Sequence, residues 1–69
     1  MSPDQFKEAR RKLGLSASQM GRAIGLHGDP GRTVRRYEAG DIEISGPVQV
    51  VVRYFLRHGL DKAARDAVG

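Results

Sequence analysis

Apolar residues recur at helical intervals in five short stretches of the chain, with glycine between most of them. In the first stretch Phe6, Ala9 and Leu13 are three and four residues apart, and a glycine follows them. The preceding letters SPDQ, at positions 2–5, form a capping box with proline at the first helical position. Together these signals predict a helix over residues 3–13.

Two further helices are predicted in the middle of the chain. Ser16 and Gln19 form a second capping box, and Gly25 ends the short helix of about nine residues that it opens. Asp29 then caps a third helix over residues 30–39, which has proline at its first position. The apolar residues that we expect these helices to turn inward are Met20, Ala23, Ile24, Val34 and Tyr37.

The remaining residues complete an all-α chain. Residues 41–46 alternate between polar and apolar types, but a lone strand has no partner, so we expect an extended loop whose two isoleucines point inward. A fourth helix is predicted over residues 47–58, capped by Ser45 or Gly46, and Asp61 caps a short last helix. The fold class predicted is an all-α compact bundle of about five short helices in a single domain.

The predicted helix over residues 30–39 carries a cluster of positive charge. At 100° per residue, Arg32, Arg35 and Arg36 form one outward patch, with Thr33 at its margin. A solvated basic face is common in soluble proteins, and it is the simplest interpretation of the patch. Arginine, however, suits bidentate recognition of phosphate and of the major-groove edge of guanine. The density of arginine over lysine therefore favours a nucleic-acid partner.

Composition sets limits on this interpretation. The 69 residues suffice for one small domain, whose core is expected to be marginal unless it packs well or a partner buries more surface. No cysteine is present, which excludes disulfides and thiolate zinc sites. The net charge of +4 fits a polyanionic partner and equally an ordinary soluble surface. No apolar segment has the length of a membrane span, so we expect a cytoplasmic protein that does not contact the membrane.

Two motifs follow each other across the second and third predicted helices. The first reads LS-x-x-x-M-x-x-AIGL over residues 15–26, and the second reads TV-x-RYE-x-G over residues 33–40. Together they resemble the LSQ-x-x-LA-x-x-LG-V and TV-x-x-WE-x-G motifs of the Cro/phage-repressor (XRE-type) regulators, a resemblance that covers residues 3–59. It implies a helix-turn-helix over about residues 16–39, of which the second helix lies in the major groove of DNA.

The resemblance assigns base contacts to this second helix. Arg32, Thr33 and Arg36 match positions that read base edges, and Arg35 lies between base readout and phosphate contact. The implied partner is double-stranded DNA, an operator with an inverted repeat. The implied function is sequence-specific transcriptional regulation, by a dimeric repressor of a small prokaryotic or phage operon that acts at the nucleoid.

Other positions match supporting roles in the family. Arg10 and Glu38 match a pair that bridges the first helix to the third, which explains why an acid stands inside a basic helix. Ser16 caps the second helix, whose amide groups face a backbone phosphate in this family. The whole set that we expect at the DNA backbone is Ser16, Ser18, Gln19, Gly31, Ser45 and Gly46.

Three features depart from the family pattern. The turn over residues 26–31 is about three residues longer than usual, so it could tilt the second helix or offer its own amides to a phosphate. Ala17 stands where the family often has a phosphate-binding glutamine, and either Ser18 or Gln19 could replace it. Acids follow the third helix where the family often has basic residues. Contact there is therefore expected only at the start of the fourth helix.

The helix over residues 47–58 has more apolar surface than one small core needs. Its wheel turns one valine-rich stripe inward, puts Gln49 on the opposite, solvated side, and leaves Val50 and Tyr54 on a flank. A wide core contact with the last helix explains this as well as self-association does. Two copies on a two-fold axis would place recognition helices about 34–36 Å apart. We expect a homodimer through Val50, Tyr54 and the segment that starts at Leu60.

Other classes of function leave weaker signals. His27 and His58 have no partner at metal-ligand spacing, and the glycines lack the lysine of a phosphate-binding loop, so we expect no metal and no cofactor. No Ser/His/Asp set or carboxylate pair indicates an enzyme. The alternative is a protein-binding module, such as an antitoxin that neutralises a partner protein through its last two helices. RNA binding lacks an exposed aromatic platform.

Overall fold

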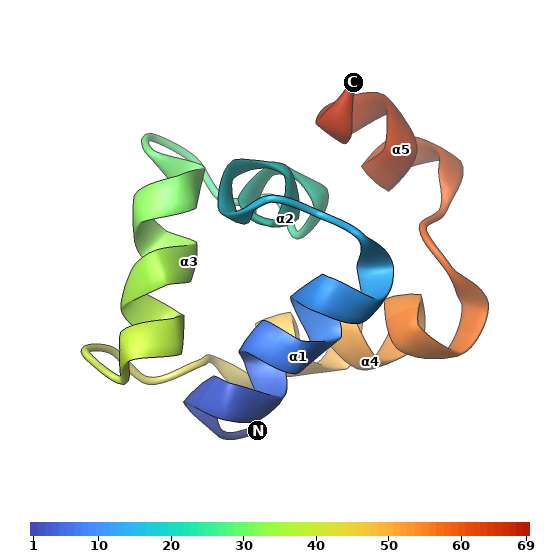
Figure 1. Ribbon diagram of the computed structural model, residues 1–69. Helices are drawn as coiled ribbons and strands as arrows, with labels where there is room; N and C mark the ends of the chain where they lie inside the picture. The colour runs from blue at the N-terminus through green and yellow to red at the C-terminus, as the bar shows by residue number, and fades with distance from the viewer.

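The computed structural model describes all 69 residues and contains five α-helices and no strand (Figure 1). The predicted all-α bundle is therefore confirmed, and residues 41–45 form a loop with Ile44 buried, as expected. None of the helices combines the length and the apolar character that a membrane span requires. The helices are α1 (Pro3–Leu13), α2 (Ala17–Ala23), α3 (Pro30–Ala39), α4 (Gly46–His58) and α5 (Lys62–Val68).

Every helix is preceded by a residue whose side-chain oxygen accepts a hydrogen bond from the backbone amide three residues later. These caps satisfy amide groups that have no partner inside the helix, which is why short helices form at these positions. The caps are Ser2, Ser16, Asp29, Ser45 and Asp61.

Two boundaries differ from the sequence prediction. Helix α4 begins at Gly46 rather than at residue 47, and Ser45, one of the two predicted caps, is its N-cap. Helix α2 has 7 residues rather than about nine, because Ile24 leaves the helical conformation and becomes the C-cap. The backbone between α2 and α3 is correspondingly longer, and Gly25 and Gly28 adopt the positive φ angles of 82° and 74° there.

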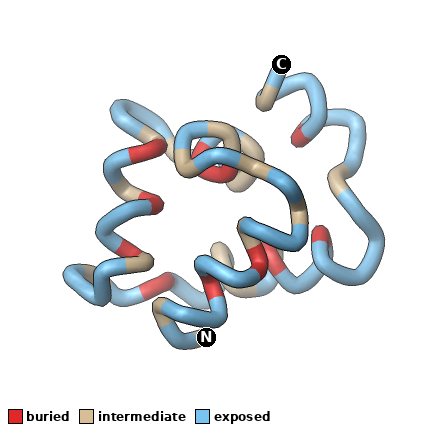
Figure 2. The backbone as a smooth tube through the Cα atoms, in the orientation of Figure 1, coloured by how far each residue is buried: buried red, intermediate tan, exposed pale blue.

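The core lies between α1, α2, α3 and α4, whose buried positions face one another (Figure 2). Phe6 of α1 and Tyr37 of α3 meet at its centre with a ring-centroid distance of 5.4 Å in an edge-to-face arrangement, which is favourable for aromatic rings. The seven residues of this core cluster are Phe6, Ala9, Met20, Val34, Tyr37, Ile44 and Val52. A core this small leaves little spare stability, so each of its contacts matters.

Helix α2 is central to the arrangement of the other helices. It packs against α3 on one side and against α5 on the other, while α1 packs against α3 and α4 (Figure 1). Only Ala64 of α5 is buried, whereas Ala67 is exposed. Helix α5 packs on α2, and Ala67 lines an open space that residues of α2 and α4 also line.

Candidate nucleic-acid interface

Helix α3 is fixed by its inner face and presents its outer face to solvent. Val34 is fully buried and Tyr37 is 7% exposed, so the inner face is part of the core. Arg32, Arg35 and Arg36 are all exposed on the opposite face. Helix α3 is therefore held in place by the apolar contacts of its inner face, and its arginines take no part in those contacts.

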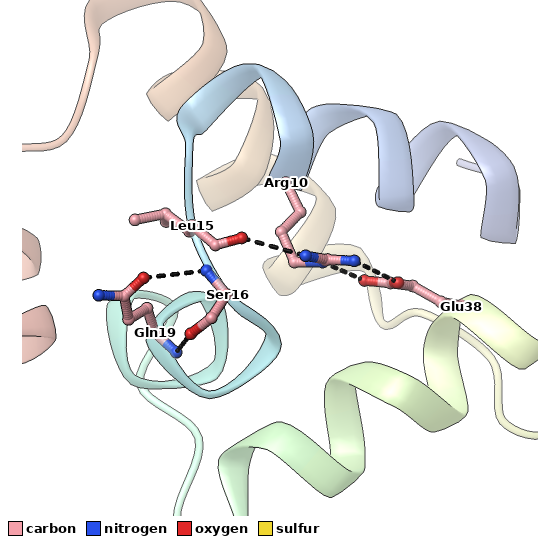
Figure 3. Close-up of polar contacts among 5 residues, drawn as sticks. All are labelled: Arg10, Leu15, Ser16, Gln19 and Glu38. Carbon is pink, nitrogen blue, oxygen red and sulfur yellow. Dashed lines mark hydrogen bonds and ion pairs between the residues drawn. The ribbon is translucent and has the colours of Figure 1, made fainter.

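An ion pair between α1 and α3 adds to this support (Figure 3). Arg10 Nε and Nη2 donate to the two carboxylate oxygens of Glu38 at 2.8 and 3.1 Å, and Arg10 Nη1 donates to the carbonyl oxygen of Leu15 at 3.1 Å. The side chains of the pair are only 19% and 10% exposed. One guanidinium thus joins α1 to α3, as expected for this pair, and also contacts the loop before α2.

The hydrogen bonds to Glu38 raise the pKa of the Arg10 guanidinium above its ordinary value, and partial burial opposes this shift without cancelling it. A group with a raised folded-state pKa stabilises the fold at pH values below its unfolded-state pKa. That contribution is lost only when the pH rises through the folded-state pKa. For an arginine this loss falls at strongly alkaline pH, so Arg10 remains charged at neutral pH.

Helices α2 and α3 approach each other so closely that two glycines are required where they meet. A Cβ atom at Gly21 would overlap Pro30, lying 2.6 Å from its carbonyl oxygen. A Cβ atom at Gly31 would lie 2.5 Å from Ser18 Oγ. Both glycines are buried. The close approach at these two glycines therefore helps to fix the position of α3 relative to α2.

The exposed guanidinium groups of α3 have no anionic partner within the molecule. The only ion pair in the structure is that of Arg10 and Glu38, and the side chains of Arg32, Arg35 and Arg36 make no hydrogen bond. The Arg35 side chain lies back along the helix, since its Nη1 is 3.2 Å from the position of a Cβ at Gly31. This arginine patch, defined as Arg32, Arg35 and Arg36, is free to bind an external anion or a base edge.

Thr33 lies beside the arginine patch but is less available than its neighbours. The residue is half-buried, and its hydroxyl donates a long hydrogen bond of 3.5 Å to the carbonyl oxygen of Asp29. Asp29 also accepts from the amide of Arg32 at 3.1 Å. The extended turn before α3 therefore ends in a hydrogen-bonded cap.

The residues expected at a DNA backbone fall into three groups. Ser16 and Gln19 close a capping box, with bonds of 3.1 and 2.9 Å (Figure 3), and Ser45 caps α4 through a bond of 3.4 Å. Ser18 and Gly46 are exposed. Gly31 is buried against Ser18, where α2 and α3 pack closely, and its phosphate contact stays a prediction.

The residues expected at a dimer interface lie on α4 and in the connection that follows it. Val50 is 65% exposed and Tyr54 is 51% exposed, whereas Leu60 is half-buried in the connection between α4 and α5. Val50 and Tyr54 border an open apolar groove of about 600 Å³ between α4, α5 and the end of α2. Sequence reasoning missed the part that α2 contributes, residues 22–25, since no periodicity in α2 indicates that α5 lies beside it.

The structure contains no group of three or more His, Asp or Glu side chains that could hold a metal ion. Comparisons of the chain with protein-family models, with curated proteins and with solved structures give no match. The features of the molecule that bear on its function are therefore the arginine patch, the contacts that fix α3, and the groove.

Proposed function

We propose that this protein is a sequence-specific regulator of transcription that binds double-stranded DNA. The observation that carries the proposal is the arginine patch, three unpaired guanidinium groups on the exposed face of a rigidly held helix. In this interpretation α2, the turn over residues 24–29 and α3 are a helix-turn-helix, and α3 is the recognition helix.

The fixed position of α3 against the core favours specific contacts with bases over non-specific binding to phosphate. A guanidinium can bind the O6 and N7 atoms of guanine in a bidentate manner only when the helix that carries it has a fixed position in the major groove. The buried residues of α3, the Arg10–Glu38 pair and the glycine contacts with α2 provide that fixed position. We assign base contacts to Arg32 and Arg36, and an edge or phosphate contact to Arg35.

In this proposal the protein represses transcription by occupying promoter DNA. The protein would act in the cytoplasm, at the nucleoid. Since one recognition helix reads only a few base pairs, we expect an operator with two half-sites arranged as an inverted repeat.

The test is selection of bound duplexes from a random DNA pool at two salt concentrations. We expect enrichment of an inverted repeat whose half-sites are about one helical turn apart. Enrichment of no sequence, with binding that disappears as salt rises, would reduce the arginine patch to non-specific attraction and contradict the proposal. An Arg32→Ala/Arg36→Ala variant is the matched control, because both side chains are exposed and make no contact that stabilises the fold.

The apolar groove favours one alternative function, a module that binds another protein, as an antitoxin does. The groove borders two exposed side chains, Val50 and Tyr54, that have no role in DNA contact. This alternative expects a tight complex with a different protein and full function in the Arg32→Ala/Arg36→Ala variant. Loss of reporter repression in that variant would support the regulator, and unchanged neutralisation of a partner protein by it would support the alternative.

A further inference from the structure

The groove beside α4 has three walls made by separate helices. Residues 22–25 at the end of α2 form one wall, α4 contributes Val50 and Tyr54, and α5 contributes Ala67 and neighbouring residues. Nine of its twelve lining residues are hydrophobic. An apolar surface of this kind on a small domain indicates an interaction site.

The occupant of the groove is indicated by the charges at its border. Arg22 and Asp61 both line the groove, both are exposed, and neither has an ion-pair partner within the molecule. Asp61 uses Oδ1 to cap α5, accepting from the amide of Ala64 at 2.8 Å, which leaves its other carboxylate oxygen available. A surface with one free cation and one free anion is complementary to a second copy of itself. A two-fold axis places the cation of each copy beside the anion of the other, which gives two ion pairs.

Tyr54 provides a matching apolar element. Its ring is half-exposed and lies against the ring of His58, one helical turn later, with a centroid distance of 4.7 Å. Each copy therefore has both a side chain that can be inserted, Tyr54, and a groove that can receive it. Tyrosine is also among the residues that contribute most to binding energy at protein interfaces.

We propose that two copies of this chain associate through the groove, with Tyr54 of each copy in the groove of the other and with two reciprocal ion pairs between Arg22 and Asp61. The proposal names the partner and the surface that the proposed function requires, and it rests on that function only for the spacing of the recognition helices. Figure 1 shows α3 and α5 on opposite sides of the molecule. Half of the spacing needed on DNA, about 17–18 Å, is well within the 30 Å longest extent of the domain.

This arrangement would couple dimer formation to DNA reading through a single helix. Helix α2 packs closely against α3 at Gly21 and Gly31, and its last residues line the groove. A partner seated in the groove therefore contacts the same rigid helix that orients α3. By linkage, an operator that holds two copies side by side would strengthen their association, and association would strengthen operator binding.

The first test is sedimentation equilibrium of the whole chain over a range of concentrations. We expect a reversible dimer whose dissociation constant rises about 30-fold or more in Tyr54→Glu, as for loss of a central aromatic contact. Leu56→Glu is the matched control, because Leu56 is 43% exposed on the same helix but lies outside the groove. A monomer at every concentration, or equal weakening by both variants, would overturn the proposal.

The second test is an exchange of charge between copies. Arg22→Glu and Asp61→Lys should each weaken self-association about tenfold or more, because each replaces two attractions by two repulsions. An equimolar mixture of the two variants should form a heterodimer, since both of its border pairs are again attractive. Circular dichroism would verify that α5 remains folded in Asp61→Lys, which loses its cap; Asp61→Asn keeps the cap and removes only the charge. Failure of the mixture to associate, with both variants folded, would overturn the reciprocal pairing.

The DNA selection separates failure of this inference from failure of the proposed function. A monomer that enriches a single short half-site would overturn the groove interface and leave DNA reading intact. A dimer with the expected variant pattern that enriches no sequence would support the interface and contradict the regulator. A monomer would also direct attention to other occupants of the groove, namely a different protein or an apolar small molecule.

Discussion

At the residue scale, Glu38 is an acid whose surroundings assign it a structural role. Replacing it by glutamine leaves the partly buried Arg10 without its anionic partner, so we expect the free energy of unfolding to fall by about 1–3 kcal/mol. Urea denaturation measures the change. Glu43→Gln is the control, since that acid is exposed and unpaired. Equal effects of the two variants would show that the ion pair contributes nothing.

A double variant separates the ion pair from the packing of its side chains. In Arg10→Met/Glu38→Leu no charge is left without a partner, and the volume is nearly retained. We therefore expect it to be more stable than Glu38→Gln, because leaving one buried charge unpaired is more destabilising than removing both. A double variant less stable than the single one would instead indicate that the bond from Arg10 to the Leu15 carbonyl is the dominant contact.

Arg36 is the residue at which base reading can be tested most directly. Arg36→Ala should weaken binding to the selected operator by about 1–3 kcal/mol and relax the preference for one base position. Arg65→Ala, on the exposed side of α5 away from α3, should have a much smaller effect. Fluorescence anisotropy on the operator and on single-base variants gives both quantities. Uniform weakening on every sequence would reassign Arg36 to a phosphate contact.

At the scale of elements, the close approach of α2 and α3 predicts an asymmetry between two glycines. Gly21→Ala gains helix propensity of about 1 kcal/mol, but its Cβ would overlap the backbone of Pro30. We expect a net loss of at least ~1 kcal/mol and a melting temperature lower by about 4–8 °C for each kcal/mol lost.

Gly46→Ala is the matched control for this prediction. Gly46 begins α4 without a positive φ angle, and no atom lies within 4 Å of its Cβ position. Alanine there should be neutral or stabilising by less than ~1 kcal/mol, because it restricts the unfolded chain. If Gly21→Ala melted at the same temperature as Gly46→Ala, the contact between α2 and α3 would be looser than the structure indicates. Differential scanning calorimetry resolves shifts of this size.

The helices themselves were largely predictable, because the signals that start them are local. Ser16 and Gln19 are only three residues apart in the sequence and hydrogen-bond to each other in the capping box, so a short sequence motif is sufficient to predict the contact. Gly31 shows the limit of such reasoning. Its position beside the arginine patch suggested exposure, but its burial depends on Ser18 of another helix, and a glycine leaves no periodic signal of such a contact.

At the scale of the whole molecule, the sequence predicted which residues of a helix are exposed better than it predicted which helices pack together. The exposure of Val50 and Tyr54 followed from the wheel of α4, but Gln49, expected on the solvated side, is half-buried and donates to the Ile44 carbonyl at 3.0 Å. The groove requires α5 to pack on α2, two helices whose adjacency is fixed only by tertiary packing. Arg10 and Glu38, 28 residues apart, were likewise linked only by the family resemblance.

A rigid dimer makes a final prediction about operator spacing. If two copies associate through the groove, their α3 helices have one fixed separation, so inserting five base pairs between the half-sites rotates one half-site to the opposite side of the duplex. We expect affinity for that operator to fall about 10²-fold or more, toward that of a single half-site, because the second contact is lost. Tyr54→Glu should bind the original and the lengthened operators with similar, weak affinity. Tight binding of the normal chain to both operators would mean that the copies bind independently, and the α2 end of the groove would then have no part in positioning α3.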